Sequence, residues 1–314
     1  MAVGLDGHLL VRPVTRSLRG AGSVPAPRYD PRVPSEPLDL RHCGHERVIG
    51  SYLLETEVGP ALFDCGPTTC IGELKARLVE RGLELRDIRH LLLSHIHLDH
   101  AGAAGVLMRE HPELTVHVSA IGAPHLVDPS RLESSARRLY GDEFDRLWGE
   151  LAPVPEENVA VVGDEVVGLE CFPTPGHASH HVCYLSRDDG TLYAGDAAGV
   201  RILPSTFVLP PTPPPEVDLE AWSSTIDAIL DRAPKRLALI HFGVAEDPRR
   251  HLEELRQRLA SWSERVREGA DEAEFEQLAE ADLGPDREAY EQAMPFWQSY
   301  AGLKRYWEKR AEAA

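Results

Sequence analysis

The chain has 314 residues, 42% of them hydrophobic and 27% charged, which is typical of a globular protein that can bury a sizeable core. Its formal net charge of −18, with no basic stripe in the sequence, argues against nucleic acid as the main partner, because so acidic a surface repels phosphate groups. There is no apolar stretch of about 18 residues, no signal-peptide core and no CxxC pair among the five cysteines, so we expect a cytoplasmic protein with free thiols and no membrane association.

Residues 1–36 are rich in arginine, proline, glycine and serine. We expect a loose N-terminal extension there, without a stable element of its own. From about Leu38 the hydrophobic pattern becomes regular. The elements expected next are, in order, the strands Val48–Glu55 and Ala61–Phe63, the helix Ile71–Arg81 and the strand Ile88–Leu93.

The rest of the chain alternates between short apolar strands and longer amphipathic segments. A helix at Ala101–Arg109, a strand at Thr115–Val118, helical structure around Leu132–Trp148, and strands at Val159–Val162, Val166–Phe172, Val182–Leu185 and Thr191–Ala194 are expected. A proline-rich loop at 203–217 follows, then a helix at Leu219–Arg232, a strand at Arg236–Ile240, and helices at Arg249–Arg267, Glu272–Ala281 and Asp286–Lys309. A strand-rich core with helices outside predicts an α/β fold of the αββα type, with two sheets face to face.

Four potential metal ligands follow the apolar strand within six residues, namely His95, His97, Asp99 and His100. Alternate positions on an extended segment point the same way, so His95 and His97 can share one ion. The chain then turns, and Asp99 and His100 can face a second ion beside the first. Imidazole and carboxylate groups suit Zn²⁺, Fe or Mn²⁺.

This HxHxDH segment resembles the signature of the metallo-β-lactamase superfamily. Further markers of that family follow the expected order, with Asp64 in LFDCG, His177 in TPGH, Asp196 in YAGD and His241 in LIHFG. The resemblance covers roughly residues 38–245. It implies a metallo-β-lactamase sandwich with a catalytic domain at 37–248, and a C-terminal helical extension at 249–314 that packs on or caps this domain.

The same resemblance implies a set of metal ligands. His95, His97 and His177 would hold one ion, Asp99, His100 and His241 would hold the second, and Asp196 would bridge both. Asp64 and His181 would lie behind these ligands and fix their orientation. His180 stands where glyoxalase II-type members often have glycine.

The segments around the site look most similar to stand-alone hydrolases related to glyoxalase II and lactonases. They imply two divalent metal ions, foremost Zn²⁺ with Mn²⁺ or Fe as alternatives, and a bridging hydroxide that cleaves a small ester, thioester or lactone. Asp99 and Asp196 would be the catalytic carboxylates, with Asp99 orienting the reaction or accepting a proton. Arg201 is a candidate contact for an anionic small-molecule substrate, and the aromatic C-terminal helices would allow a homodimer.

Three alternatives stay open at this point. The same two-metal site could hydrolyse a phosphoester or phosphodiester, since the metals serve both reactions. A mononuclear iron enzyme similar to persulfide dioxygenases of this fold would need fewer ligands. A non-catalytic binding protein is disfavoured, because no ligand of the set is missing.

Overall fold

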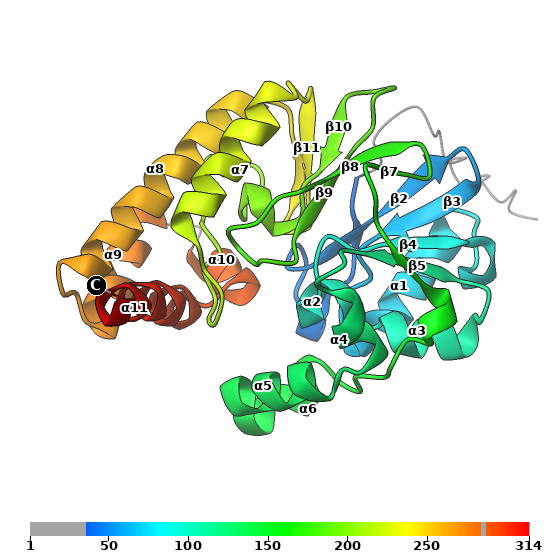
Figure 1. Cartoon of the computed structure of the whole chain (residues 1–314), viewed down its shortest axis with the longest axis horizontal. Helices are drawn as coiled ribbons and strands as arrows, with labels where there is room; N and C mark the ends of the chain where they lie inside the picture. Colours follow the sequence, from blue (N-terminus) through cyan, green and yellow to red (C-terminus); the bar gives the residue numbers. More distant parts are fainter. Residues whose placement is uncertain (1–35, 284–286, 314) are drawn as a thin grey trace, which may run out of the picture.

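Two six-stranded β-sheets face each other in the computed structural model, which describes residues 36–283 and 287–313 (Figure 1). The expected N-terminal extension lies, apart from Glu36, outside the described residues. The first sheet contains β1 (Leu38–Asp39), β2 (Gly50–Thr56), β3 (Gly59–Phe63), β4 (His90–Leu92), β5 (Thr115–Val118) and β6 (Val159–Val161) in that order. The second contains β12 (Gly243–Ala245), β11 (Arg236–Leu239), β10 (Thr191–Tyr193), β9 (Val182–Leu185), β8 (Leu169–Pro173) and β7 (Glu165–Val166).

The two sheets are joined by aromatic side chains on their inner faces. The Tyr52 hydroxyl on β2 donates hydrogen bonds to the carbonyl oxygens of Leu239 (3.0 Å) and Gly243 (2.9 Å) in the opposite sheet. The ring of Phe63 on β3 meets that of Tyr184 on β9 edge to face, with centroids 5.9 Å apart. A buried Tyr hydroxyl ordinarily needs a hydrogen-bond partner, and for Tyr52 the two carbonyl oxygens of the opposite sheet serve as partners. This core confirms the predicted αββα sandwich with two sheets face to face.

Helices surround the two sheets and extend beyond them (Figure 1). They are α1 (Ile71–Glu80), α2 (Leu98–Ala101), α3 (Ala104–Glu110), α4 (Ala123–Val127), α5 (Ser130–Tyr140), α6 (Phe144–Leu147), α7 (Leu219–Asp231), α8 (Pro248–Arg267), α9 (Glu272–Leu283), α10 (Arg287–Ala293) and α11 (Phe296–Ala313). Helices α1 and α3 lie on the side of the first sheet, and α7 and α8 on the side of the second. Helices α5 and α6 lie beyond the end of the sandwich, opposite α11 (Figure 1).

Three predicted elements are each divided into two. The last predicted helix, Asp286–Lys309, is interrupted between α10 and α11 at Pro295, because proline has no N–H to donate and its ring clashes with the preceding turn. The predicted strand Val166–Phe172 is a tight hairpin of β7 and β8 that turns at Val167 and Gly168, both with positive φ. The helix predicted at Ala101–Arg109 is α3, preceded by the one-turn α2.

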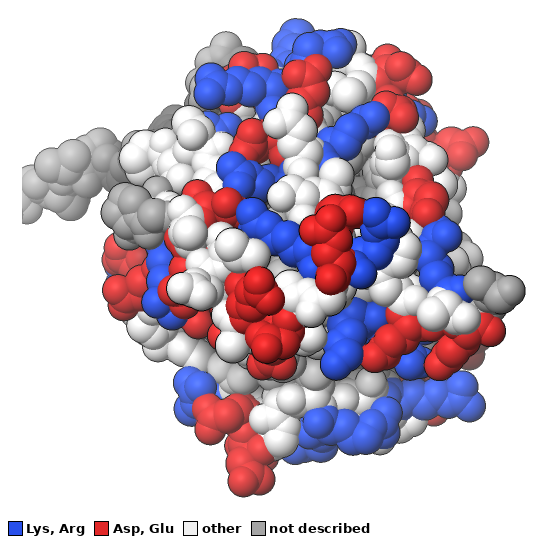
Figure 2. Space-filling model, turned by 90° about the vertical axis from the view of Figure 1, so that its left-hand side faces the viewer, with Lys and Arg blue, Asp and Glu red and all other residues white. Residues whose placement is uncertain are grey.

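The C-terminal helices share one aromatic cluster with the loop that follows β10. Trp262 of α8 is fully buried, with its ring 5.1 Å from Phe275, 6.3 Å from Phe296 and 6.4 Å from Phe207. The domain boundaries at 37–248 and 249–314 stay a prediction. Figure 2 shows acidic and basic side chains interspersed on the face formed by these helices, and the ion pair of Arg258 with Asp282 connects α8 to α9. None of the described helices is long and apolar enough to cross a membrane.

Candidate metal centre

The predicted ligands lie on loops and short helical turns at one edge of the sandwich. His95 and His97 follow the end of β4, whereas Asp99 and His100 lie on α2. The other three lie in the loops after β8, β10 and β11 and are His177, Asp196 and His241. Strand β4 is parallel to β3, and β10 is parallel to β11, so their carboxyl ends meet at this edge. Sheet pairing therefore gathers residues that are far apart in the sequence.

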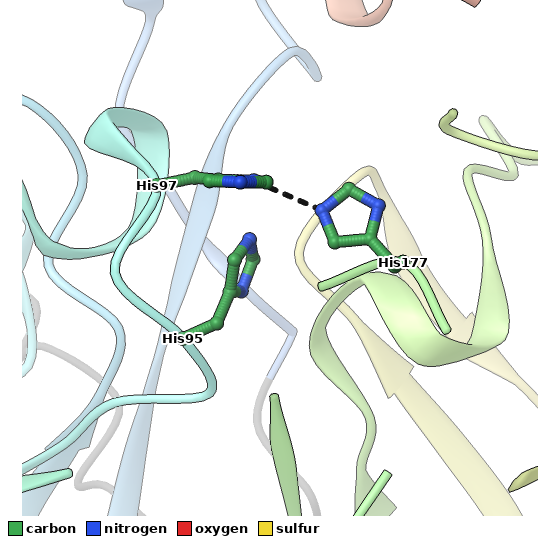
Figure 3. A group of neighbouring side chains, drawn as sticks. All are labelled: His95, His97 and His177. Atoms are coloured by element: carbon green, nitrogen blue, oxygen red, sulfur yellow. Dashed lines mark hydrogen bonds between the residues drawn. The ribbon is translucent and has the colours of Figure 1, made fainter. Parts of the chain in front are cut away.

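His95, His97 and His177 form a first group of ligand atoms that all lie within 4.8 Å of one another. Figure 3 shows the three rings converging, with His97 Nδ1 and His177 Nε2 2.9 Å apart. The ring of His95 lies 4.5 Å from that of His97 and 4.9 Å from that of His177. Three imidazoles at this spacing can bind one divalent ion.

Asp99, His100 and His241 form a second such group. Asp99 Oδ2 lies 3.6 Å from His100 Nε2 and 3.4 Å from His241 Nε2. Both imidazoles are buried, whereas the Asp99 side chain is 16% exposed. This group therefore opens towards solvent at its carboxylate.

Asp196 lies between the two groups. Its Oδ2 is 3.3 Å from His177 Nε2, whereas its Oδ1 is 3.3 Å from His100 Nε2 and 3.6 Å from His241 Nε2. The two oxygens of one carboxylate thus face different histidine groups. A carboxylate in this position could contact a cation bound by either group.

Hydrogen bonds to main-chain carbonyls fix two of the histidines. His177 Nδ1 bonds to the Pro211 carbonyl oxygen at 2.8 Å, and His241 Nδ1 to that of Val48 at 2.6 Å. A carbonyl oxygen only accepts, so in each ring Nδ1 carries the proton. The Nε2 atom of each ring is thereby directed into the site, where a metal ligand would present it.

Asp64 fixes a third histidine from behind. Its fully buried carboxylate accepts hydrogen bonds from Ser94 N–H, Ser94 Oγ–H and His100 Nδ1–H, each at 2.7 Å. Burial raises the pKa of Asp64, and these donors oppose that rise. The contact directs His100 Nε2 into the site, as expected of a residue that orients a ligand.

Unpaired buried polar atoms and neutral imidazole rings make the site suitable for a cation. Among the described residues, nine buried side-chain polar atoms have no hydrogen-bond partner, and four of them are His95 Nε2, His100 Nε2, Asp196 Oδ1 and His241 Nε2. Unpaired buried polar atoms are costly, so their concentration here indicates a site for a positively charged partner. Burial lowers the pKa of His95 and His97, and neighbouring imidazoles lower it further. These rings are therefore neutral and free to donate a lone pair.

The carboxylates of this site are ionised. Burial alone would raise the pKa of Asp99 and Asp196, but His100 and His241 hold both values below the usual range. Burial also lowers the pKa of His100, whereas the carboxylates of Asp99, Asp196 and Asp64 raise it above its ordinary value. A cation bound in the site would compensate the negative charge of these carboxylates in place of the proton on His100.

His181 and Arg201 lie outside both ligand groups. His181 Nε2 accepts a hydrogen bond from Asp196 N–H at 3.1 Å, and its Nδ1 bonds to Thr174 Oγ1 at 2.7 Å, so both ring nitrogens are engaged. The Arg201 side chain donates from Nε to the Ser205 carbonyl oxygen at 2.8 Å. Arg201 lines a small separate cavity rather than the one beside the predicted ligands.

Sequence reasoning missed the cavity that adjoins this site. It is bordered by His97, Asp99 and Asp196 on one side and by α5 on another. Leu132, Ala136 and Leu139 of α5 line it. Their i, i+4, i+7 spacing was visible in the sequence, but it is also the spacing of a helix packed on a core.

Fold and site together define an αββα sandwich with a histidine- and aspartate-lined candidate metal centre at one edge. The family model of the metallo-beta-lactamase superfamily matches residues 46–244. The chain belongs to this superfamily of hydrolases, whose members bind divalent metals, as its motifs predicted.

Among curated relatives, the chain is 28% identical over 185 residues to the metallo-beta-lactamase fold-containing protein ST1585 of Sulfurisphaera tokodaii, covering 56% of this chain and 68% of that protein. It is 28% identical over 174 residues to an N-acyl homoserine lactonase of a Bacillus species, covering 47% and 59%. It is 30% identical over 110 residues to hydroxyacylglutathione hydrolase of Salmonella paratyphi A, covering 34% and 32%. The chain thus spans only part of the length of these relatives.

Solved structures match more of the chain. ST1585 from Sulfolobus tokodaii has a TM-score of 0.60 at 20% identity, covering 87% of this chain and 96% of that one. The family protein TTHA1429 from Thermus thermophilus has a TM-score of 0.60 at 24% identity, covering 84% and 89%. TTHA1623, solved in a di-iron-bound form, has a TM-score of 0.50 at 24% identity, covering 71% and 94%. At these identities the likeness establishes the fold.

Proposed function

We propose that this chain is a dinuclear metal hydrolase that cleaves a small ester, thioester or lactone. The observation that carries the proposal is the position of Asp196, whose two carboxylate oxygens face different histidine groups. His95, His97 and His177 would hold one ion, Asp99, His100 and His241 the other, with Asp196 shared. Five imidazoles and two carboxylates favour Zn²⁺, with Mn²⁺ and Fe as alternatives.

The bound ions would supply Lewis acidity and activate water near neutral pH. The chain's own residues prepare the site for that chemistry. Asp99 is ionised, partly exposed and lines the adjoining cavity, so its carboxylate can orient a water molecule or accept its proton. Ile96 and Leu98 border the same cavity and add apolar surface beside the predicted ligands.

The relatives named as a lactonase and as a hydroxyacylglutathione hydrolase favour hydrolysis of a carbonyl compound. A small-molecule substrate follows from the modest size of the cavity. The cytoplasmic location and the homodimer stay predictions from the sequence.

Elemental analysis of the purified protein tests the metal count. We expect two Zn, Mn or Fe ions per chain. Hydrolysis is then screened on thioester, lactone and phosphodiester substrates. The variant Asp196→Ala should lose at least one ion and its activity, because no other described carboxylate is placed between the two groups.

Asp189→Ala, in the turn before β10, is the matched control. Asp189 accepts hydrogen bonds from Thr191 within its own turn and belongs to neither ligand group, so metal content and activity should be retained. One iron per chain without hydrolysis would favour the mononuclear oxygenase instead. No metal after careful reconstitution would refute the proposal.

A further inference from the structure

A cavity of about 240 Å³ opens directly onto the metal centre. His97, Asp99 and Asp196 border it on the side of the predicted ligands. The opposite borders come from α5, from the proline-rich loop and from the C-terminal helices. Any substrate whose carbonyl group reaches the metal centre must place the rest of its body in this cavity.

Helix α5 forms one wall of the cavity. None of its residues is buried, although a helix in a globular protein ordinarily gains its stability by burying an apolar face. Leu132, Ala136 and Leu139 line the cavity. Among its charged residues, Arg137 pairs with Glu133 and with Asp145 of α6, whereas Arg131 lines the cavity. The apolar face of α5 is therefore available for a ligand.

The facing wall is also largely apolar. It is formed by the prolines at 213–215 and by Met294, which follows α10, together with the polar Glu216 and Gln298. The end of α5 approaches α11 through the Tyr140 hydroxyl, which donates to Gln298 Oε1 at 3.5 Å. The Tyr140 ring meets that of Trp148 edge to face at 5.1 Å. Three separate parts of the chain thus supply apolar stretches of the cavity wall, and His125, Ser135, His180 and Gln298 add polar groups to it.

Away from Asp99 and Asp196, charged side chains are sparse along the cavity. Arg131 is the one Lys or Arg among its described lining residues, and Glu216 is the one Glu. Glu216 accepts a hydrogen bond from Ser179 Oγ at 2.6 Å. A substrate with two carboxylates, such as a glutathione thioester, would find one cationic partner. An uncharged apolar group would match the walls.

We infer that the substrate carries an uncharged acyl or alkyl chain of medium length, which lies between α5 and the proline-rich loop. This inference rests on the proposed function. At about 30 Å³ per water-sized group, the cavity holds roughly eight methylene-sized groups. In the reaction, the oxygen of water bonds to the carbonyl carbon, the acyl carbon–oxygen bond breaks, and the leaving oxygen takes the proton. The products are a carboxylic acid and an alcohol, or one hydroxy acid from a lactone.

A chain-length series tests the inference. With p-nitrophenyl esters from acetate to decanoate, kcat/KM of the metal-loaded enzyme should rise about fourfold per methylene, because each buried methylene contributes about 0.8 kcal/mol, and should level off near eight carbons. Ala136→Trp fills the cavity and should lower the octanoate-to-acetate ratio of kcat/KM at least tenfold. Ser134→Trp, on the exposed face of α5, should keep the wild-type ratio.

A binding measurement separates this inference from the proposed function. Calorimetry should show that 1-octanol binds and ethanol does not, with octanol binding weakened at least tenfold in Ala136→Trp and unchanged in Ser134→Trp. Octanol binding in a protein that hydrolyses no ester would support the cavity's ligand class and count against the hydrolase. A flat chain-length profile without octanol binding would overturn the inference and leave the hydrolase intact. Preference for a glutathione thioester over the octanoate ester would also overturn it.

Discussion

Replacement of Asp64 by asparagine tests how the metal centre is held in place. The carboxylate is fully buried and accepts three hydrogen bonds of 2.7 Å, two from Ser94 and one from His100. The amide of Asp64→Asn retains one oxygen, but its NH₂ group must face at least one of these donors. That position changes from an attractive contact to a repulsive one.

The size of the effect follows from these contacts. A hydrogen bond to a charged group contributes about 1.5–3 kcal/mol, so losing one should lower the free energy of unfolding by about 2–3 kcal/mol. In either orientation of the amide, His100 loses the charged acceptor that directs its Nε2 into the site. Loss of a partner that orients a metal ligand typically lowers metal affinity about 10–100-fold.

Two measurements on the same samples check this. Urea unfolding of the metal-free protein gives the change in stability, and chelator competition with Zn²⁺ gives the affinity. Asp189→Asn is the control, since Asp189 accepts hydrogen bonds from Thr191 N–H and Oγ–H in the turn before β10, and its Zn²⁺ affinity should equal that of wild type. Wild-type Zn²⁺ affinity in Asp64→Asn would refute the reasoning that Asp64 orients His100.

Two further outcomes follow from the structure. Gly195 has φ +47°, and an added Cβ would lie 2.6 Å from Ser94 Cβ and 2.7 Å from His181 Nε2, so Gly195→Ala should lower the free energy of unfolding in urea by about 2–5 kcal/mol. The control Gly82→Ala, at a glycine with φ +77° and open space around it, should lower it by about 1–2 kcal/mol. Equal losses in the two variants would contradict the crowding argument. Burial lowers the pKa of His251 from 6.5 to about 4, so the folded state holds this ring neutral while the unfolded chain takes up a proton below pH 6.5. The contribution of His251 to stability is therefore complete above pH 6.5, and about 3 kcal/mol of it is lost as the pH falls to 4. His251→Gln should show a correspondingly smaller loss of unfolding free energy over this window, and an unchanged pH profile would count against a buried neutral His251.

The sequence by itself determined the fold class and the composition of the candidate centre. His95, His97, Asp99 and His100 fall within six residues at a strand end, so local geometry alone brings them together. The break at Pro295 was also readable from the sequence, because proline cannot continue the helix that surrounds it, yet the amphipathic pattern on both sides predicted one helix.

Tertiary structure decided how the remaining parts meet. Whether Asp196 lies between the two histidine groups depends on the pairing of β10 with β11 and on the packing of the two sheets, since these contacts join residues distant in the chain. The same holds for the Val48 carbonyl that orients His241. The apolar residues of α5 have the spacing of any amphipathic helix, and only the position of that helix places them beside a cavity rather than a core. Hydrophobic periodicity identifies which face of a helix is apolar, but what that face meets is set by contacts distant in the sequence.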